Sequence, residues 1–146
     1  MTNDIHALIP AARKAALAAV AELRDKKYLH KVTSTARTED EQIALWLQNR
    51  ASLEVVNLQR KHAKMYLISE KENTRRVTNA DGVNTLSRHQ VGDALDVVPL
   101  GPTGNPIWPS PEDPRWCMIA GVMEKHGFKW GGRWAEPDVP HYEYVG

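Results

Sequence analysis

The run of apolar residues from Ala94 to Val98 restricts the fold most, because a carboxylate, Asp96, interrupts it. Successive side chains of a β-strand point to opposite faces of the sheet. In a strand, Leu95 and Val97 therefore face one side, and Asp96 faces the other between apolar neighbours. A carboxylate in such surroundings is costly unless an arginine, backbone amides or a metal ion compensates for the burial. The sequence thus predicts a largely buried strand with a polar partner near its middle.

The remaining segments predict helices and short strands that share one core. The 146 residues, 42% hydrophobic and 25% charged, have the size and composition of a single domain. We see no internal repeat and no low-complexity linker, so we expect one α+β domain over residues 1–146. We expect helices over 10–23, from residue 38, around 53–58 and over 115–126, and extended segments over 31–36 and 94–98.

Two helix starts carry clear local signals. Pro10 fits the first position of an amphipathic helix whose packed stripe includes Leu17 and Val20. Thr38 and Glu41 have the spacing of a capping box, in which each side chain bonds the backbone of the other residue. The sequence therefore predicts where both helices begin.

Charge and cysteine content exclude some classes of partner. The formal net charge of +1 gives no general electrostatic reason to expect nucleic acid. Charged Glu22 and Arg24 close the apolar stretch that starts at Ala15, which argues against membrane insertion and a cleaved signal peptide. We therefore expect synthesis in the cytoplasm and a monomer. The single cysteine, Cys117, cannot form an internal disulfide and is predicted to be a buried small hydrophobe.

Two histidines are candidate partners for the carboxylate of Asp96. His89 lies seven residues before it, and the Gly92-Asp93 pair allows a turn that could bring both side chains to one point. The alternative is that His89 is an exposed loop residue. His141 follows Pro140, which keeps this segment out of a helix interior. A third ligand from this segment would leave the fourth position of a zinc ion open to water, the arrangement of catalytic zinc sites.

Four segments together resemble a known family. They are S-x-H-x-x-G-x-A-x-D over 87–96, W-G-G-x-W over 130–134, D-x-x-H-Y over 138–142, and an extended segment with arginine and glutamine over 32–42. The pattern resembles the zinc peptidases that cut bacterial peptidoglycan stem peptides. These include D-alanyl-D-alanine carboxypeptidases and L-alanyl-D-glutamate endopeptidases, bacteriophage endolysins among them.

The resemblance implies a fold, a cofactor and roles for several residues. The fold would be α+β, a small antiparallel sheet with packed helices like that of hedgehog and D-Ala-D-Ala peptidases. His89, Asp96 and His141 would bind Zn²⁺, and Asp138 would be the general base that takes a proton from the attacking water. Arg37 would stabilise the oxyanion or clamp a substrate carboxylate, with a structural salt bridge as its alternative role.

Further residues are candidates for contact with the substrate. They are Ser87, Gln42, Trp134 and Tyr142. Ser87 would bond the substrate or orient the turn before His89. The aromatic residues of the carboxyl-terminal segment would form core and cleft wall, with a sugar-stacking platform as the alternative.

The function that this resemblance implies is hydrolysis of the L-alanyl-D-glutamate bond of peptidoglycan stem peptides by a phage or prophage endolysin. The enzyme would be made in the host cytoplasm and reach the wall after release. One alternative is a D-alanyl-D-alanine carboxypeptidase. A non-catalytic, hedgehog-like zinc-binding domain is another, although such a domain does not need the free carboxylate of Asp138.

The stretch from Gln59 to Arg76 is basic, with six lysines and arginines against two acidic residues. Such a run is typical of a solvated face. It could also associate with an anionic polymer such as the bacterial wall, in a manner that salt screens.

Overall fold

The computed structural model describes all residues from 1 to 146. Its contacts divide the chain into two compact units. The sheet unit comprises residues 2–36 and 92–146, and the helical unit comprises Met1 and residues 37–91. The prediction of a single domain over residues 1–146 stays a prediction, and each unit is described by itself.

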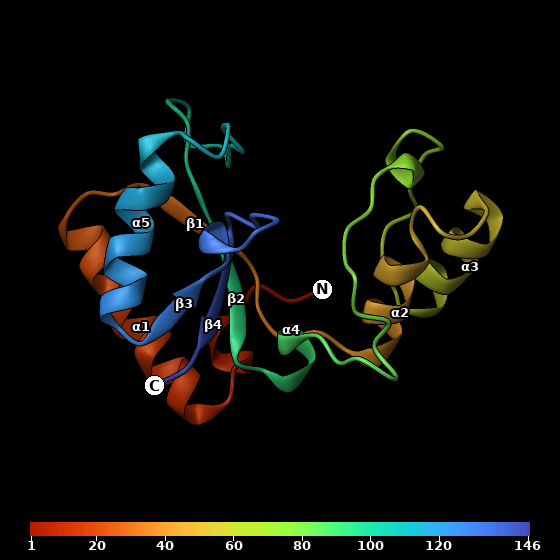
Figure 1. Ribbon diagram of the computed structural model, residues 1–146, viewed down its shortest axis with the longest axis horizontal. Coiled ribbons are helices and arrows are strands. Elements are labelled where there is room, and N and C mark those ends of the chain that lie inside the picture. Colours follow the sequence, from red (N-terminus) through yellow and green to blue (C-terminus); the bar gives the residue numbers. More distant parts are fainter. The chain divides into compact units, whose positions relative to one another are not determined.

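The sheet unit is built on four antiparallel strands in the order β1-β2-β4-β3, with every neighbouring pair antiparallel (Figure 1). This arrangement confirms the predicted α+β class and the small antiparallel sheet. Its elements are the short 3₁₀ helix η1 (Ile5–Ala7), α1 (Pro10–Asp25), β1 (His30–Ser34), β2 (Ala94–Pro99), α5 (Pro114–Lys125), β3 (Phe128–Trp130), η3 (Gly131–Arg133) and β4 (His141–Tyr144).

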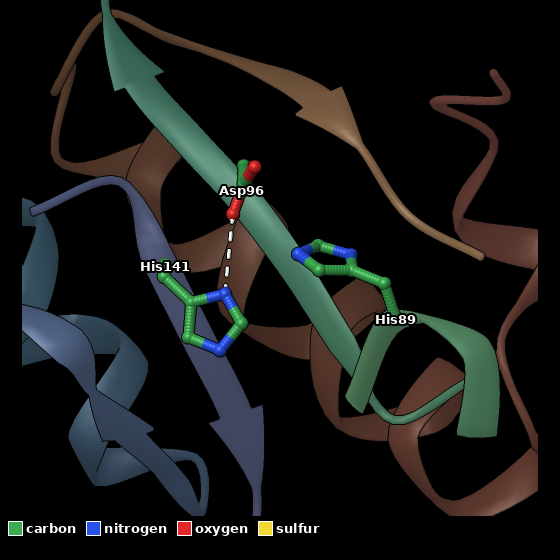
Figure 2. Close-up of side chains that lie close together, drawn as sticks. All are labelled: His89, Asp96 and His141. Atoms are coloured by element: carbon green, nitrogen blue, oxygen red, sulfur yellow. Dashed lines mark ion pairs between the residues drawn. The ribbon is translucent and has the colours of Figure 1, made fainter. Parts of the chain in front are cut away.

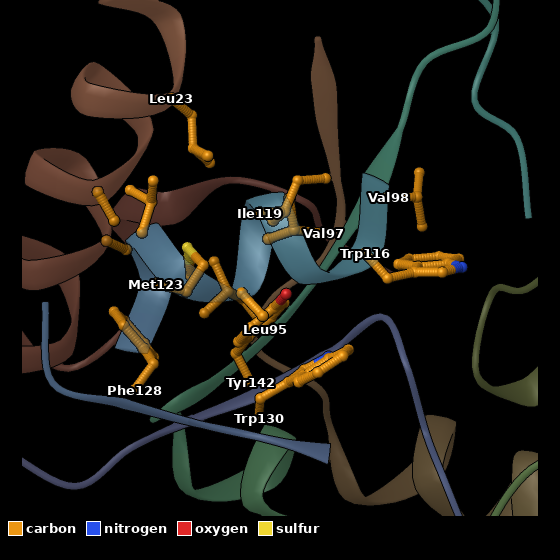
Figure 3. Packing of buried hydrophobic residues seen from close by; sticks show 14 of the residues in the cluster. Leu23, Leu95, Val97, Val98, Trp116, Ile119, Met123, Phe128, Trp130 and Tyr142 are labelled. Atoms are coloured by element: carbon orange, nitrogen blue, oxygen red, sulfur yellow. The ribbon is translucent and has the colours of Figure 1, made fainter. Parts of the chain in front are cut away.

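Helices α1 and α5 pack against each other and bury the apolar side of the sheet (Figure 3). As predicted, α1 begins with Pro10 at its first position. Gly127, with a φ of +94°, follows the end of α5. Leu95 and Val97 lie in the buried hydrophobic cluster, as the strand alternation predicted. The prediction that Ala94–Val98 forms a buried strand is therefore confirmed.

Two side chains on these helices lie where the sequence analysis did not expect them. Cys117 is exposed, so its prediction as a buried hydrophobe is wrong: the buried face of α5 passes through Trp116 and Ala120 instead. Leu17 is 42% exposed, because α1 faces the core with small residues such as Ala16. In both cases the neighbouring residue occupies the buried stripe, and one residue corresponds to about 100° of rotation around the helix.

The helical unit contains α2 (Glu39–Leu47) packed on α3 (Leu53–His62), the 3₁₀ helix η2 (Glu72–Thr74) and the four-residue α4 (Arg88–Val91). The capping box predicted at the start of α2 is present, with both reciprocal bonds of Thr38 and Glu41. No helix of the chain is both long enough and apolar enough to span a bilayer.

Candidate metal centre

Three potential metal ligands converge in the structure. One donor atom each from His89, Asp96 and His141 lies within 4.8 Å of the donor atoms of the other two (Figure 2). The three residues come from α4, β2 and β4, respectively. The structure thus brings together residues that are far apart in the sequence, as predicted.

A short helix, and not an exposed loop, carries His89. The side chain of Ser87 accepts a hydrogen bond from the His89 amide (3.2 Å), and the Gln90 side chain accepts one from the Ser87 amide (2.9 Å). These reciprocal bonds fix the start of α4 in the manner of a capping box. Gly92, with a φ of +88°, then turns the chain into β2, as the Gly92-Asp93 signal indicated. His89 is only 3% exposed, so the alternative of an exposed loop histidine is excluded.

The register of the sheet places Asp96 beside His141. These residues are direct partners in the antiparallel pairing of β2 with β4. The Asp96 Oδ1 atom lies 3.4 Å from the Nδ1 atom of His141. One of the two histidines that the sequence indicates as partners of Asp96 therefore lies next to its carboxylate.

The imidazole ring of His141 is contacted on three sides. Its Nδ1 atom faces Asp96, its Nε2 atom lies 3.0 Å from Glu143 Oε1, and the Trp134 ring centroid lies 5.2 Å from its own. Burial alone lowers the pKa of His141, but hydrogen bonds and charge from Asp96, with further contributions from Glu143 and Asp138, raise it overall. In the metal-free chain, the surrounding carboxylates thus favour the protonated ring.

The exposed residue Asp138 sits in a tight loop next to His141. Its amide donates to the Gly131 carbonyl (2.9 Å), and its carbonyl accepts from the His141 amide (3.1 Å). A Cβ atom on Gly131 would lie 2.6 Å from the Asp138 carbonyl oxygen, so a larger residue could not fit without moving the loop. The glycine of the W-G-G-x-W motif therefore lets the Asp138 loop close against β4.

Arg37 is tied to the chain segment that carries His89. Its amide donates to the His89 carbonyl (3.0 Å), and its Nη1 atom donates to Gln42 Oε1 (2.8 Å). Arg37 as a whole residue is half-buried. The catalytic role of Arg37 and its structural alternative both stay predictions.

Two residues predicted to contact substrate are fully buried. Gln42 donates to the Thr78 hydroxyl (3.1 Å) and the Ala80 carbonyl (2.8 Å) in addition to accepting from Arg37. Tyr142 packs in the hydrophobic cluster of the sheet unit, because strand alternation turns it away from the face of His141. In this structure Gln42 holds neighbouring groups in place, and Tyr142 lies in the core, as the core interpretation of these aromatic residues predicted. Contacts of the two residues with a substrate stay predictions.

The other two substrate-contact predictions concern residues that are partly accessible. Ser87 is half-buried and its hydroxyl fixes α4, which agrees with the orienting role considered for it. Trp134 is half-buried against the His141 ring. Their contacts with a substrate stay predictions. Sequence reasoning also missed Glu143, although a residue two positions after His141 on a strand must share its face.

The donor set fits zinc. Two imidazole nitrogens and one carboxylate oxygen are ligands that Zn²⁺ accepts, and three protein ligands are the number found in catalytic zinc sites. The low exposure of both histidines also agrees with ligands held in place by the fold. The residues present are thus suited to bind the metal that the sequence predicted.

Comparison with known proteins supports the same assignment. Residues 81–144 match the D-alanyl-D-alanine carboxypeptidase family. The L-Ala D-Glu endopeptidase ChiX of Serratia marcescens has a similar structure, with a TM-score of 0.57 and 19% identity over 97% of this chain and 83% of that one. No curated protein matches the sequence.

Two further solved structures share the fold at a TM-score of 0.57 and 17% identity, each over 95% of this chain. One is the LD-carboxypeptidase LdcB, of which 66% is covered. The other is the D,D-pentapeptidase VanY from a VanB-type vancomycin resistance cassette, in complex with Zn(II), of which 73% is covered.

The predicted resemblance to the zinc peptidase family is therefore confirmed, and it rests on the family match of residues 81–144 together with the shared fold. This stretch contains all three residues of the metal-binding group, which confirms Zn²⁺ as the cofactor. The family match and the metal centre together support a metallopeptidase.

Proposed function

We propose that this protein is a zinc-dependent endopeptidase that hydrolyses the L-alanyl-D-glutamate bond of peptidoglycan stem peptides. The observation that carries the proposal is the convergence of His89, Asp96 and His141, with Asp138 in the adjoining loop. Three protein ligands suffice for catalytic zinc. Asp138 is an additional, exposed carboxylate near the ligand His141, and such a group is suited to proton transfer. A purely structural zinc site has no need of that group.

The residues of this chain divide the chemistry among them. When bound, Zn²⁺ supplies a Lewis acid that polarises the scissile carbonyl and makes water more acidic. The Asp138 carboxylate takes one proton from the attacking water while the oxygen of that water bonds to the carbonyl carbon. The same residue returns that proton to the amine nitrogen as the C–N bond breaks. Arg37, beside the His89 segment, stabilises the developing negative charge or binds a substrate carboxylate.

The choice of bond rests on one structural neighbour. ChiX is an L-Ala D-Glu endopeptidase, and it shares the fold over most of both chains. The alternative is cleavage of a terminal D-alanyl-D-alanine bond, which the family description and VanY favour. That reaction would need a cation for the free carboxylate of the substrate, and Arg37 is the candidate for this role.

The biological setting that we propose is host-cell lysis by a bacteriophage endolysin. The enzyme would be made in the host cytoplasm, reach the wall after release, and act there as a monomer. The exposed basic residues between 59 and 76 would hold it near the anionic wall; Arg60 is excluded from this surface because it is buried. Lys61, Lys64 and Lys71 are exposed members of the surface.

Wall association is tested by reversing the charges of these three lysines to glutamate. Binding to purified walls should weaken at low salt and change little at high salt, because salt screens exposed charges. Cleavage of short soluble stem peptides should stay at the rate of the unaltered enzyme. A large loss of soluble-peptide cleavage would instead place this surface in the active site.

The bond cut is tested by digesting purified wall fragments and identifying the products by mass spectrometry. New amino-terminal D-glutamyl or isoglutaminyl ends would establish the endopeptidase. Release of free D-alanine would establish the carboxypeptidase instead. The matched control is the Asp138→Asn variant, which should form the same product about 10²-fold or more slowly.

A further inference from the structure

Glu143 has a place in the metal centre that the family motif does not include. It lies two residues after His141 on β4, so both side chains emerge on the same face of the sheet. The Glu143 Oε1 atom lies 3.0 Å from the Nε2 atom of His141. The two side chains are 21% and 8% exposed, respectively, so solvent competes little for this hydrogen bond.

The position of Glu143 is fixed by the sheet. Strand β4 lies between β2 and β3, and Glu143 is paired with Ala94 on one side and Lys129 on the other. The Trp134 ring packs on His141 and restricts rotation of the imidazole. Both partners of the hydrogen bond are therefore held by structure that does not depend on a bound metal.

The chemistry of this contact selects one tautomer of His141. An ionised carboxylate can only accept hydrogen bonds, and a neutral imidazole carries one N–H group. Asp96 and Glu143 are both acceptors, and the contact with Glu143 is the shorter one at 3.0 Å, so in a neutral ring it favours the proton on Nε2 and leaves the lone pair on Nδ1. The Nδ1 atom is the one that faces Asp96 at 3.4 Å (Figure 2). In this tautomer, the unprotonated nitrogen of His141 lies on the side of Asp96, another residue of the candidate metal centre.

We propose that Glu143 is a positioning residue that holds His141 in the tautomer and orientation required to bind Zn²⁺ through Nδ1. Carboxylates that accept a hydrogen bond from the far nitrogen of a ligating histidine raise its basicity and orient its ring. The proposal rests on the zinc peptidase function proposed above. It adds a residue that acts on the metal through His141 without touching the metal or the substrate.

The test compares Glu143→Ala and Glu143→Gln with Glu112→Gln, a control at an exposed position. Zinc affinity is measured by competition with a chelator of known affinity. Loss of such a carboxylate costs about 10- to 100-fold in metal affinity, so Glu143→Ala should fall in this range. Glu143→Gln keeps the size and one acceptor oxygen, and its affinity should lie between those of Glu143→Ala and the unaltered protein. The control should bind zinc as the unaltered protein does.

A second readout uses the zinc-free protein and needs no activity. Long-range ¹⁵N–¹H spectra of the histidine rings show which nitrogen carries the proton, at a pH where His141 is neutral. We expect the Nε2–H form in the unaltered protein and the Nδ1–H form in Glu143→Ala, where the Asp96 carboxylate still faces Nδ1 of the ring. A cooperative melt of each variant checks that it is folded. Unchanged zinc affinity in both Glu143 variants, or a His141 ring protonated on Nδ1 in the unaltered protein, would overturn the proposal.

These readouts separate this inference from the proposed function. If zinc affinity depends on Glu143 but wall fragments are not cut, the peptidase assignment fails and the positioning role stands. If wall fragments are cut while both Glu143 variants bind zinc as the control does, the peptidase assignment stands and the positioning role fails.

Discussion

The two units of the chain are stabilised in different ways. The sheet unit buries one hydrophobic cluster of sixteen residues, whereas the cluster in the helical unit consists of Ala44, Leu45 and Met65. The helical unit instead buries polar side chains that bond the backbone of its loops. Arg60 donates to the Tyr66 carbonyl, and Gln48 donates to the Glu72 and Arg75 carbonyls.

Because of this difference, the two units position their candidate functional side chains by different interactions. Buried apolar area stabilises the sheet, and the strand register then places Asp96 beside His141. In the helical unit, directional hydrogen bonds fix the loops, and Gln42 holds the Arg37 guanidinium in the same way. We therefore expect the sheet unit to be destabilised most by truncation of buried apolar side chains. The helical unit should be destabilised most by removal of buried hydrogen-bond donors.

The largest effect is expected from Leu95→Ala in the sheet core. Leu95 is fully buried, and truncation of such a residue costs about 2–5 kcal/mol through lost burial and the cavity that remains. The free energy of unfolding, measured by denaturant titration, should fall by that amount. Leu29→Ala, at a residue that is 64% exposed, is the control and should change it little. Equal effects of the two variants would contradict the apolar account of this unit.

A smaller and more local effect is expected from Arg60→Met in the helical unit. The substitution keeps much of the apolar stem but leaves the Tyr66 carbonyl and the buried Gln48 side chain without the Arg60 donors, at a cost of about 1–3 kcal/mol. Hydrogen exchange should accelerate in α3 and the loop after it. Lys61→Met, at the exposed neighbouring position, should leave exchange unchanged. Unaltered exchange in Arg60→Met would show that the buried donors do not hold the loop.

The capping box of α2 should contribute less to the free energy of unfolding than either of these buried side chains. Thr38→Ala removes the acceptor for the Glu41 amide, and loss of such a cap costs about 1 kcal/mol. Thr38→Ser keeps the hydroxyl and should retain nearly all of the stability. Denaturant unfolding of both variants measures the difference, and a Ser variant as unstable as the Ala variant would exclude the hydrogen bond as the cause.

The smallest effect is a pH dependence at the start of α5. Side-chain and backbone hydrogen bonds from Arg115 hold the pKa of Asp113 at about 2, below its ordinary value of 3.8. A lowered folded-state pKa means that this contribution to stability is present above pH 3.8 and is lost as the pH falls towards 2. Asp113→Asn should make the unfolding free energy less dependent on pH in this range. An unchanged pH dependence would contradict the assignment.

Local signals predicted much of the fold, and spaced motifs predicted the metal ligands. Pro10, the Thr38 capping box and the alternation around Asp96 act through near neighbours, so the sequence displays them directly. The burial of Gln42 could not be predicted in this way, because its partners Thr78 and Ala80 lie in a loop without periodicity. Gln42 is thus a motif residue that holds the neighbouring loop and Arg37 in place while it is itself buried.

Strand periodicity carries information about two further residues of the sheet, Tyr142 and Glu143. Tyr142 follows His141 directly on β4, so the two side chains must point to opposite faces. The same alternation places Glu143 on the face of His141. Strand periodicity, applied to the carboxyl-terminal motif as it was to residues 94–98, would have moved Tyr142 to the core and indicated Glu143. The exposure of Cys117 depended on the rotation of α5, which sequence periodicity defines less sharply.

We propose that Asp138 moves the proton while Asp96 binds the metal. The most direct measurement determines zinc content and turnover of stem peptides in parallel for Asp138→Asn and Asp96→Asn. Asp138→Asn should retain near-stoichiometric zinc and a cooperative melt but lose about 10²-fold or more in turnover, the scale of a general base. Asp96→Asn should lose zinc affinity. A fully active Asp138→Asn protein, or a folded one without zinc, would contradict this assignment.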